Sequence, residues 1–173
     1  MSATSADVVT LDVVAERAAV VAEARSWLGT PFHHAARIKG AGVDCAQLLL
    51  GVYAGLGLVE ELNVGRYAPD WFVHQPRAPG SLGILLDVIT RECVERPLSH
   101  VTPGDILVFA YGRAPSHAAI VTATAPPSPL LLVIHSFRAS GVQEDDAGPR
   151  SPLGARIDSA WTLRRWAAAE GSA

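Results

Sequence analysis

The hydrophobic pattern of this chain changes near Pro97, and that change limits the folds open to it. Before Pro97, apolar residues recur at helical spacing in three segments: 11–28, 44–58 and 82–93. After it, short apolar runs bounded by Pro- and Gly-rich turns predict strands over 106–109, 117–123 and 130–137. Helices followed by strands indicate an α+β domain, with N-terminal helices packed on a central antiparallel β-sheet.

The remaining segments are assigned more coarsely. We expect edge strands over 141–144 and 161–166, and loops over 69–80 and 145–156 that could serve in docking. A length of 173 residues suits one domain, so we expect residues 1–173 to form it. Its core would span about 10–166, and residues 167–173 would be a short flexible tail.

The second helical segment begins with the sequence Asp44-Cys45 and is apolar on nearly every side. A helix of that kind is expected to be buried at the centre of the domain. Asp44 stands where an N-cap acid belongs, which places Cys45 in the first helical turn. The positive end of a helix lowers the pKa of a thiol, so this position favours a reactive cysteine.

Cysteine catalysis also needs a base to take the thiol proton and a third polar group to orient that base. His117 and His135 are candidates, since each lies on its own predicted strand and neighbouring antiparallel strands could bring them together. From these residues alone, a buried structural cysteine and two ordinary core histidines remain the alternative interpretation.

Two further alternatives concern the same cysteine. Two cysteines are too few for a disulfide scaffold, although a single Cys45–Cys93 bridge stays open. A metal site built from Cys45, His117, His135 and a loop histidine is a second alternative. The chain contains neither an HExxH nor a CxxC pattern, so we predict no metal and no cofactor.

Five short strings together resemble one known family, in the order in which that family has them. They are Leu28-Gly29-Thr30-Pro31-Phe32, Asp44-Cys45-Ala46-Gln47-Leu48, Pro103-Gly104-Asp105-Ile106-Leu107, Ser116-His117-Ala118-Ala119-Ile120 and Ile134-His135-Ser136. The chain is similar here to the NlpC-type papain-like cell-wall cysteine peptidases. The loop over residues 31–45 resembles the branch of that family found in phage tails and prophages.

The resemblance implies a papain-like NlpC fold with the nucleophile at the N-terminus of a buried helix. It makes Cys45 the nucleophile, His117 the base and His135 the orienting residue. The backbone N–H of Cys45 would belong to the oxyanion hole. The implied activity is that of a cysteine endopeptidase, which hydrolyses amide bonds in the stem peptides of peptidoglycan.

The chain departs from the family at positions that would contact substrate. Phe32 replaces the usual Tyr, and Ala46 replaces a Ser that helps bind the free amine of the stem peptide. Asp44 is retained and could pair with a cationic amine. His33 and His34 lie just before the nucleophile, where they would line the substrate groove or belong to an exposed polar loop.

Charge and hydropathy limit the kinds of partner that we expect for this chain. A net charge of -3 without a basic stripe argues against nucleic-acid binding. No apolar run approaches the roughly 20 residues that a membrane-spanning helix needs. The N-terminal residues do not resemble a signal peptide, so we expect cytoplasmic synthesis followed by incorporation into a virion or tail-like particle through tail-hub proteins. A structural tail or baseplate component without activity, and a cytosolic amidase acting on wall fragments, are the alternatives.

Overall fold

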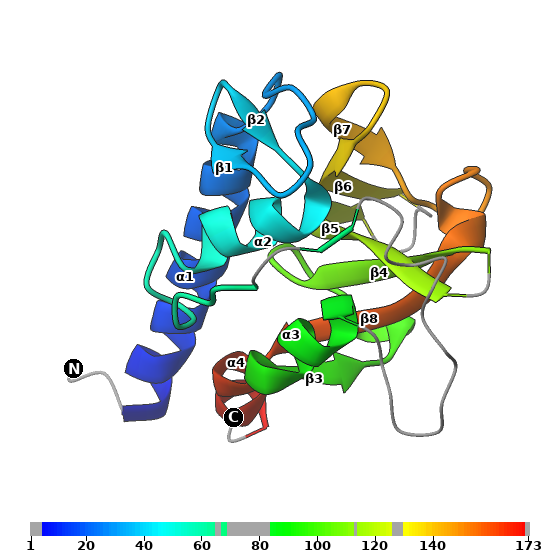
Figure 1. The fold of residues 1–173 in the computed structure, drawn as a ribbon. Coiled ribbons are helices and arrows are strands. Elements are labelled where there is room, and N and C mark those ends of the chain that lie inside the picture. The colour runs from blue at the N-terminus through cyan, green and yellow to red at the C-terminus, as the bar shows by residue number, and fades with distance from the viewer. Residues whose placement is uncertain (1–4, 65–66, 69–83, 113, 126–129, 172–173) are drawn as a thin grey trace.

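The computed structural model describes residues 5–64, 67–68, 84–112, 114–125 and 130–171 of the chain. Helices and strands follow one another in the order α1 (Ser5–Ser26), β1 (Arg37–Ile38), β2 (Gly42–Val43), α2 (Cys45–Tyr53), α3 (Ile84–Glu92), β3 (Cys93–Arg96), β4 (Ile106–Tyr111), β5 (Ala114–Ala125), β6 (Leu130–Phe137), β7 (Gly141–Asp146), β8 (Ile157–Leu163) and α4 (Arg164–Glu170). Two short 3-10 helices, Leu98–His100 and Gly154–Arg156, lie in the connections. This arrangement confirms the predicted α+β class (Figure 1).

Six strands form one antiparallel sheet in the order β3-β8-β4-β5-β6-β7. The strands predicted over 106–109, 117–123 and 130–137 correspond to β4, β5 and β6, and the segment 141–144 belongs to the edge strand β7. The prediction of an edge strand over 161–166 is wrong. The strand β8 ends at Leu163 and lies inside the sheet, because β3 pairs along its outer side.

Alternating side chains divide the apolar core between the two faces of the sheet. On one face α2 packs on β5 and β6, while α1 packs on α2 and β5. The core on that face includes the fully buried Leu48, Val52, Ile120 and Ile134. A smaller cluster on the other face contains Leu107, Phe109, Val121 and Val133. Burying each such side chain contributes roughly 1.5–3 kcal/mol, so this packing fixes the sheet and α2 relative to one another.

The helix α2 begins as predicted and ends earlier than predicted. Asp44 is its N-cap, and the side-chain carboxylate accepts a hydrogen bond of 2.9 Å from the backbone N–H of Gln47. The prediction that the helix continues to residue 58 is wrong, since it ends at Tyr53. Gly55 and Gly57 follow, and Gly57 has φ of +68°, which a helix cannot include.

Residues 167–170 belong to a helix, which corrects the expectation of a flexible tail for that part of 167–173, while residues 172–173 lie outside the described residues. The helix α4 spans Arg164–Glu170, and its Trp166 is fully buried. The indole N–H of Trp166 donates to Glu16 at 2.6 Å, and the Arg17 guanidinium lies 4.3 Å from the ring centroid. These contacts from α1 hold α4 against the domain.

A charge cluster centred on the buried Asp105, called here the arginine network, joins α1 to the sheet. It consists of Arg17, Arg96, Asp105, Thr162 and Glu170. Asp105 is 0% exposed and accepts from Arg17 at 2.8 Å and Arg96 at 3.1 Å. Arg17 also donates to Thr162 at 3.0 Å and to Glu170 at 2.8 Å. Asp105 therefore supports the sheet.

The segment before α2 also differs from the loop predicted for it. The strands β1 and β2 form a small antiparallel hairpin over residues 37–43. Val43 hydrogen-bonds the backbone carbonyl of Pro31 at 3.0 Å, and Ser136 on β6 donates to the carbonyl of Val43 at 2.7 Å. The hairpin thus ties the start of α2 to the central sheet. Among the described helices, none has the length and apolarity required to cross a membrane.

Candidate active site

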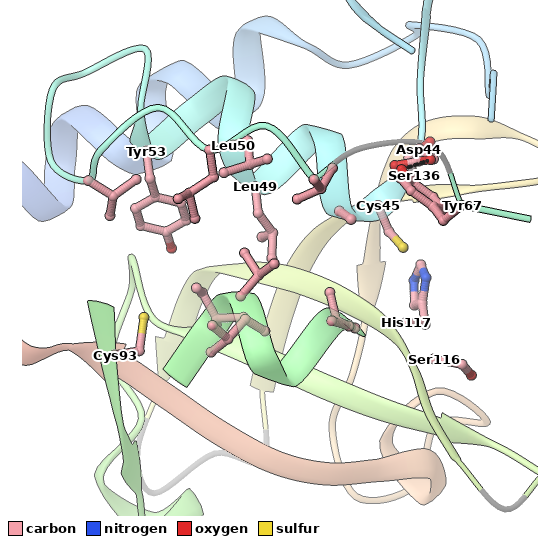
Figure 2. A pocket seen from close by; sticks show the side chains of 18 of the residues that line it. Asp44, Cys45, Leu49, Leu50, Tyr53, Tyr67, Cys93, Ser116, His117 and Ser136 are labelled. Carbon is pink, nitrogen blue, oxygen red and sulfur yellow. Dashed lines mark hydrogen bonds between the residues drawn. The ribbon is translucent and has the colours of Figure 1, made fainter. Parts of the chain in front are cut away.

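Cys45 is the first residue of α2, and its thiol faces the central sheet. Figure 2 shows its sulfur pointing toward the ring of His117, which lies on β5. Neither Cys45 nor Cys93 forms a disulfide. The placement matches the predicted geometry, in which a cysteine at a helix N-terminus faces a histidine on a strand.

The two predicted histidines lie in direct contact. Nε2 of His117 is 2.7 Å from Nδ1 of His135, and both side chains are buried. Nε2 of His135 is in turn 2.8 Å from Oδ2 of Asp145 on β7. His135 pairs with Gln143 across β6 and β7, so Asp145 lies two residues along, on the diagonal of the same face. We call His117, His135 and Asp145 the histidine relay.

The acceptor at the end of the relay determines the tautomer of both rings. The Asp145 carboxylate is an acceptor, so Nε2 of His135 carries the hydrogen and its Nδ1 must accept. His117 then donates from Nε2, and its own Nδ1 is the nitrogen left with a lone pair for the thiol. This is the arrangement that a general base beside a cysteine requires.

Burial keeps both reacting groups neutral in the free protein, so the predicted lowering of the Cys45 thiol pKa by the helix N-terminus is wrong for the unliganded site. Burial, together with the Asp44 carboxylate, raises the pKa of Cys45 to about 12, although the backbone N–H groups of Ala118, Ala46 and Cys45 itself lower it. Burial, followed by the neighbouring His135, lowers the pKa of His117 to about 3. The site therefore holds a thiol next to a neutral imidazole, and the proton can move to His117 as the sulfur attacks.

At the other end of the relay, Asp145 is held in its ionised form. Its partial burial opposes charge, but hydrogen bonds from His135 and Gln143 outweigh that effect and lower its pKa. An ionised carboxylate keeps His135 in the tautomer described above. The relay thus ends in a fixed negative charge.

Asp44 organises the loop in front of the site. Its Oδ1 accepts from Gln47, while its Oδ2 accepts from the backbone N–H of Ala35 at 2.7 Å and from the hydroxyl of Tyr67 at 2.6 Å. Only 4% of the residue is exposed. His34 packs edge-on against Tyr67 and approaches its backbone carbonyl to 2.7 Å. The acceptors of Asp44 are therefore engaged by the protein itself.

The predicted substrate-binding residues fall into two groups. Phe32, His34 and Asp44 line a cavity together with Cys45 and His117. His33 is exposed and is not among the described lining residues. It packs over the β1–β2 hairpin, where a Cβ placed on Gly42 would lie 2.5 Å from its own Cβ.

The cavity extends far beyond the thiol. It has a volume of about 280 Å³. Figure 2 shows it running from Cys45 and His117 between α2 and α3 toward Tyr53 and Cys93. Its walls are mostly aliphatic, and Tyr67 and Ser136 lie near the thiol end.

Two residues of this site, Asp145 and Tyr67, were not predicted from the sequence. Asp145 was assigned to a loop because the strand candidate stopped at residue 144; β7 continues to Asp146. Extending that strand by one residue and applying the two-residue alternation would have placed Asp145 on the face of His135. Tyr67 lies in a segment without periodicity, and no pattern pointed to it.

Among the residues that the structure describes, no group of three or more His, Cys, Asp or Glu side chains is arranged to hold a metal ion. The relay explains why its members do not form such a group. The ring nitrogens that face one another are joined by hydrogen bonds.

Comparisons with solved structures show which known fold this chain shares. No protein-family model and no curated protein matches the chain. A solved structure of the NlpC/p60 domain of the peptidoglycan hydrolase SagA is 20% identical, with a TM-score of 0.53, and the match covers 85% of this chain and 98% of that one.

Two larger solved proteins are similar in the same way. An NlpC/p60 family protein from Bacillus cereus ATCC 10987 is 19% identical over 83% of this chain, with a TM-score of 0.54. A lipoprotein-like NLP/P60 family protein from Staphylococcus aureus subsp. aureus Mu50 is 16% identical over 86%, with a TM-score of 0.55. This chain covers 39% and 41% of their lengths. The predicted NlpC-type fold is confirmed.

Proposed function

We propose that this chain is a cysteine hydrolase that cleaves amide bonds in the stem peptides of peptidoglycan. The observation that carries the proposal is the thiol of Cys45 at a helix N-terminus, pointing at a histidine that is oriented by the rest of the relay. The substrate class is supported by the likeness in fold to a domain of a peptidoglycan hydrolase.

In the proposed mechanism Cys45 is the nucleophile and His117 is the general base. As Sγ forms a bond to the carbonyl carbon of the substrate, the thiol proton passes to Nδ1 of His117. The backbone N–H of Cys45 donates to the developing oxyanion. His117 then protonates the leaving amine as the C–N bond breaks, and a water molecule hydrolyses the thioester to release the acid and the thiol.

His135 and Asp145 are positioning residues in this proposal. His135 accepts the Nε2 hydrogen of His117 and so stabilises the imidazolium that forms when the thiol proton arrives. Asp145 keeps His135 in the tautomer that can accept. Both groups act on the reaction through His117.

Substrate contacts are proposed for Phe32 and His34, which line the cavity with the thiol, while the Asp44 carboxylate is occupied by hydrogen bonds from the protein and holds the loop. Phe32 lacks a hydroxyl, but Tyr67 brings one to the same cavity and hydrogen-bonds it to Asp44. Tyr67 can therefore supply the polar contact that the Tyr-to-Phe departure removes. The exposed His33 stays a prediction for the outer part of the groove.

The test uses purified protein with intact peptidoglycan and with soluble stem peptides, and mass spectrometry of the products. Cys45→Ala is assayed beside the wild type. Cleavage by the wild type alone would support the proposal and locate the bond. Cleavage by both would remove Cys45 from its role. Cleavage by neither would favour a structural component of the same fold.

Delivery on a phage-tail-like particle is a further part of the proposal. It is supported by the likeness of the loop over residues 31–45 to the phage-tail branch of the family. Such a particle would carry the protein to the wall and bind it through hub proteins. If antibodies against the protein never detect it in purified particles, this part of the proposal is wrong. Activity on soluble wall fragments but not on intact wall would instead point to a cytosolic amidase.

A further inference from the structure

We infer that the cavity behind Cys45 binds an unbranched apolar acyl chain, so that the thiol also accepts medium-chain acyl groups from ester donors. The inference rests on the proposed role of Cys45 as nucleophile. It adds a substrate class that a polar stem peptide does not represent. Three features of the cavity carry it: the lining, the size and the position relative to the sulfur.

The lining is aliphatic along most of its length. Leu49 and Leu50 of α2 contribute to the lining, and so do Leu85, Val88 and Ile89 of α3. Only three of the described lining residues carry a formal charge at neutral pH, namely Asp44, Glu92 and Arg138. Because the Asp44 carboxylate is engaged by its own loop, little in the cavity can pair with a charged ligand.

This lining selects against the charged groups of a stem peptide. Carboxylates and ammonium groups are costly to bury where no partner replaces their hydration. A chain of methylene groups gains free energy in the same place, about 0.8 kcal/mol for each one removed from water. The cavity is therefore matched to a hydrocarbon, and the polar mouth near Cys45 is left for the bond that reacts.

The size of the cavity sets the length of the chain. An apolar cavity of about 150 Å³ is large enough to bind benzene. At about 280 Å³ the present cavity is nearly twice that volume. Benzene has six carbons, so at the same volume per carbon the space holds an acyl chain of at most roughly eleven carbons.

The sulfur lies at one end of this space, and Tyr53 and Cys93 lie at the other (Figure 2). An acyl chain inserted toward Tyr53 would place its carbonyl carbon at Cys45. In the step that follows, an S–C bond forms and the bond from the carbonyl carbon to the alcohol oxygen breaks. The thiol proton passes through His117 to the alcohol, and water then releases the fatty acid and regenerates the thiol.

The first experiment compares p-nitrophenyl octanoate with p-nitrophenyl acetate. For the wild type we expect kcat/KM to be at least tenfold higher for octanoate after correction for the uncatalysed rates. Val88→Trp narrows the lined space and should lower kcat/KM for octanoate at least tenfold relative to the same variant's value for acetate. Val14→Trp, at a helix position 60% exposed, is the matched control and should keep the preference.

Equal rates for the two esters in the wild type, or an unchanged preference in Val88→Trp, would overturn the inference and leave the nucleophile in place. A second experiment tests the cavity without its chemistry, by calorimetric binding of the neutral ligand octanamide to Cys45→Ala. Saturable binding that Val88→Trp abolishes in the same background supports the cavity assignment. Binding without ester hydrolysis by the wild type would disprove the role of Cys45 alone, and absence of binding would overturn the acyl site.

Discussion

The arginine network and the histidine relay are both centred on buried polar side chains, and they differ in whether one member faces the cavity. The arginine network is closed, because Asp105 is fully buried and its carboxylate accepts from both arginines and from the backbone N–H of Thr102. The histidine relay is open at one end, since His117 lines the cavity and faces the thiol of Cys45. Both clusters bury groups that water would otherwise solvate.

The difference indicates different uses for buried polarity. A charge cluster whose members pair with one another stabilises one arrangement of α1, α4 and the sheet. A relay that ends at a cavity keeps one ring nitrogen for chemistry. Substitutions in the network should therefore change stability without changing the chemistry of the folded molecules, and substitutions in the relay should do the reverse.

The largest expected effect on activity comes from substitution of Cys45, at the open end of the relay. Cys45→Ala should lower kcat for stem-peptide hydrolysis by roughly 10⁴ to 10⁶ fold, because it removes the nucleophile. The free energy of unfolding should change by less than about 1 kcal/mol, since a thiol is replaced by a methyl group near a cavity. Urea unfolding and product analysis measure the two quantities.

Cys93→Ala is the matched control, because Cys93 is a buried cysteine at the far end of the same cavity. It should keep kcat within a few fold. If Cys93→Ala removed activity as completely as Cys45→Ala, the assignment of Cys45 as the nucleophile would be wrong.

At the closed cluster the expected effect is on stability. Asp105→Ala leaves Arg17 and Arg96 without the carboxylate between them, and loss of one partner in a buried ion pair costs about 3–5 kcal/mol. Thermal and urea unfolding should show this loss, while kcat per folded molecule stays unchanged at low temperature. Asp158→Ala, at an exposed position on β8, serves as control and should change stability by less than about 0.5 kcal/mol. A folded Asp105→Ala variant with a strongly reduced kcat would contradict the separation of the two clusters.

How far the sequence predicts these two clusters depends on how local each one is. Cys45 was predicted because a helix start is a local signal, written in the residues from Asp44 onward. His117 and His135 were predicted because both fall inside strands whose apolar pattern is strong. The pairing of adjacent strands then follows from short connections. The contact between the histidines needed no long-range information.

The residues that the sequence did not predict depend on contacts between distant segments or on the exact residue at which a strand or helix ends. Asp145 lies near the end of β7, where a difference of two residues decides whether a side chain belongs to a strand. The helix α4 forms from residues of weak periodicity because Trp166 packs against α1, about 150 positions earlier in the chain. For the same reason the full arginine network could not be read from the turn at Asp105 alone.

Substitution of Asp145, at the end of the relay away from the thiol, should have an intermediate effect on activity. Asp145→Asn replaces the carboxylate that accepts from His135, and an outer partner of this kind typically contributes 10- to 100-fold. The amide can present a donor to His135, which favours the wrong tautomer and lowers kcat with little change in KM. Because the loss of charge also changes the proton affinity of the two rings, the pH profile of kcat should shift as well.

Asp146→Asn is the matched control for this prediction. Asp146 is the next residue on β7, and its carboxylate accepts from the backbone N–H of Gly148 at 2.7 Å. It should leave kcat and its pH profile in place. Equal behaviour of the two variants would mean that Asp145 supports the strand end and does not position His135.

The smallest effect concerns the dependence of stability on pH. Burial and the neighbouring His135 lower the pKa of His117 from the usual 6.5 to about 3. Between these values the unfolded chain binds a proton at this position and the folded protein does not, so stability falls as the pH drops below 6.5. The slope from this one group reaches at most about 1.4 kcal/mol per pH unit.

His117→Gln should remove that slope and make the free energy of unfolding less sensitive to pH between 6.5 and 5. His33→Gln, which changes an exposed histidine outside the cavity lining, is the control and should keep the wild-type slope. Urea unfolding at several pH values measures the difference. An identical slope in wild type and His117→Gln would mean that the folded protein accepts a proton within the relay. His117 would then be positively charged before the thiol attacks.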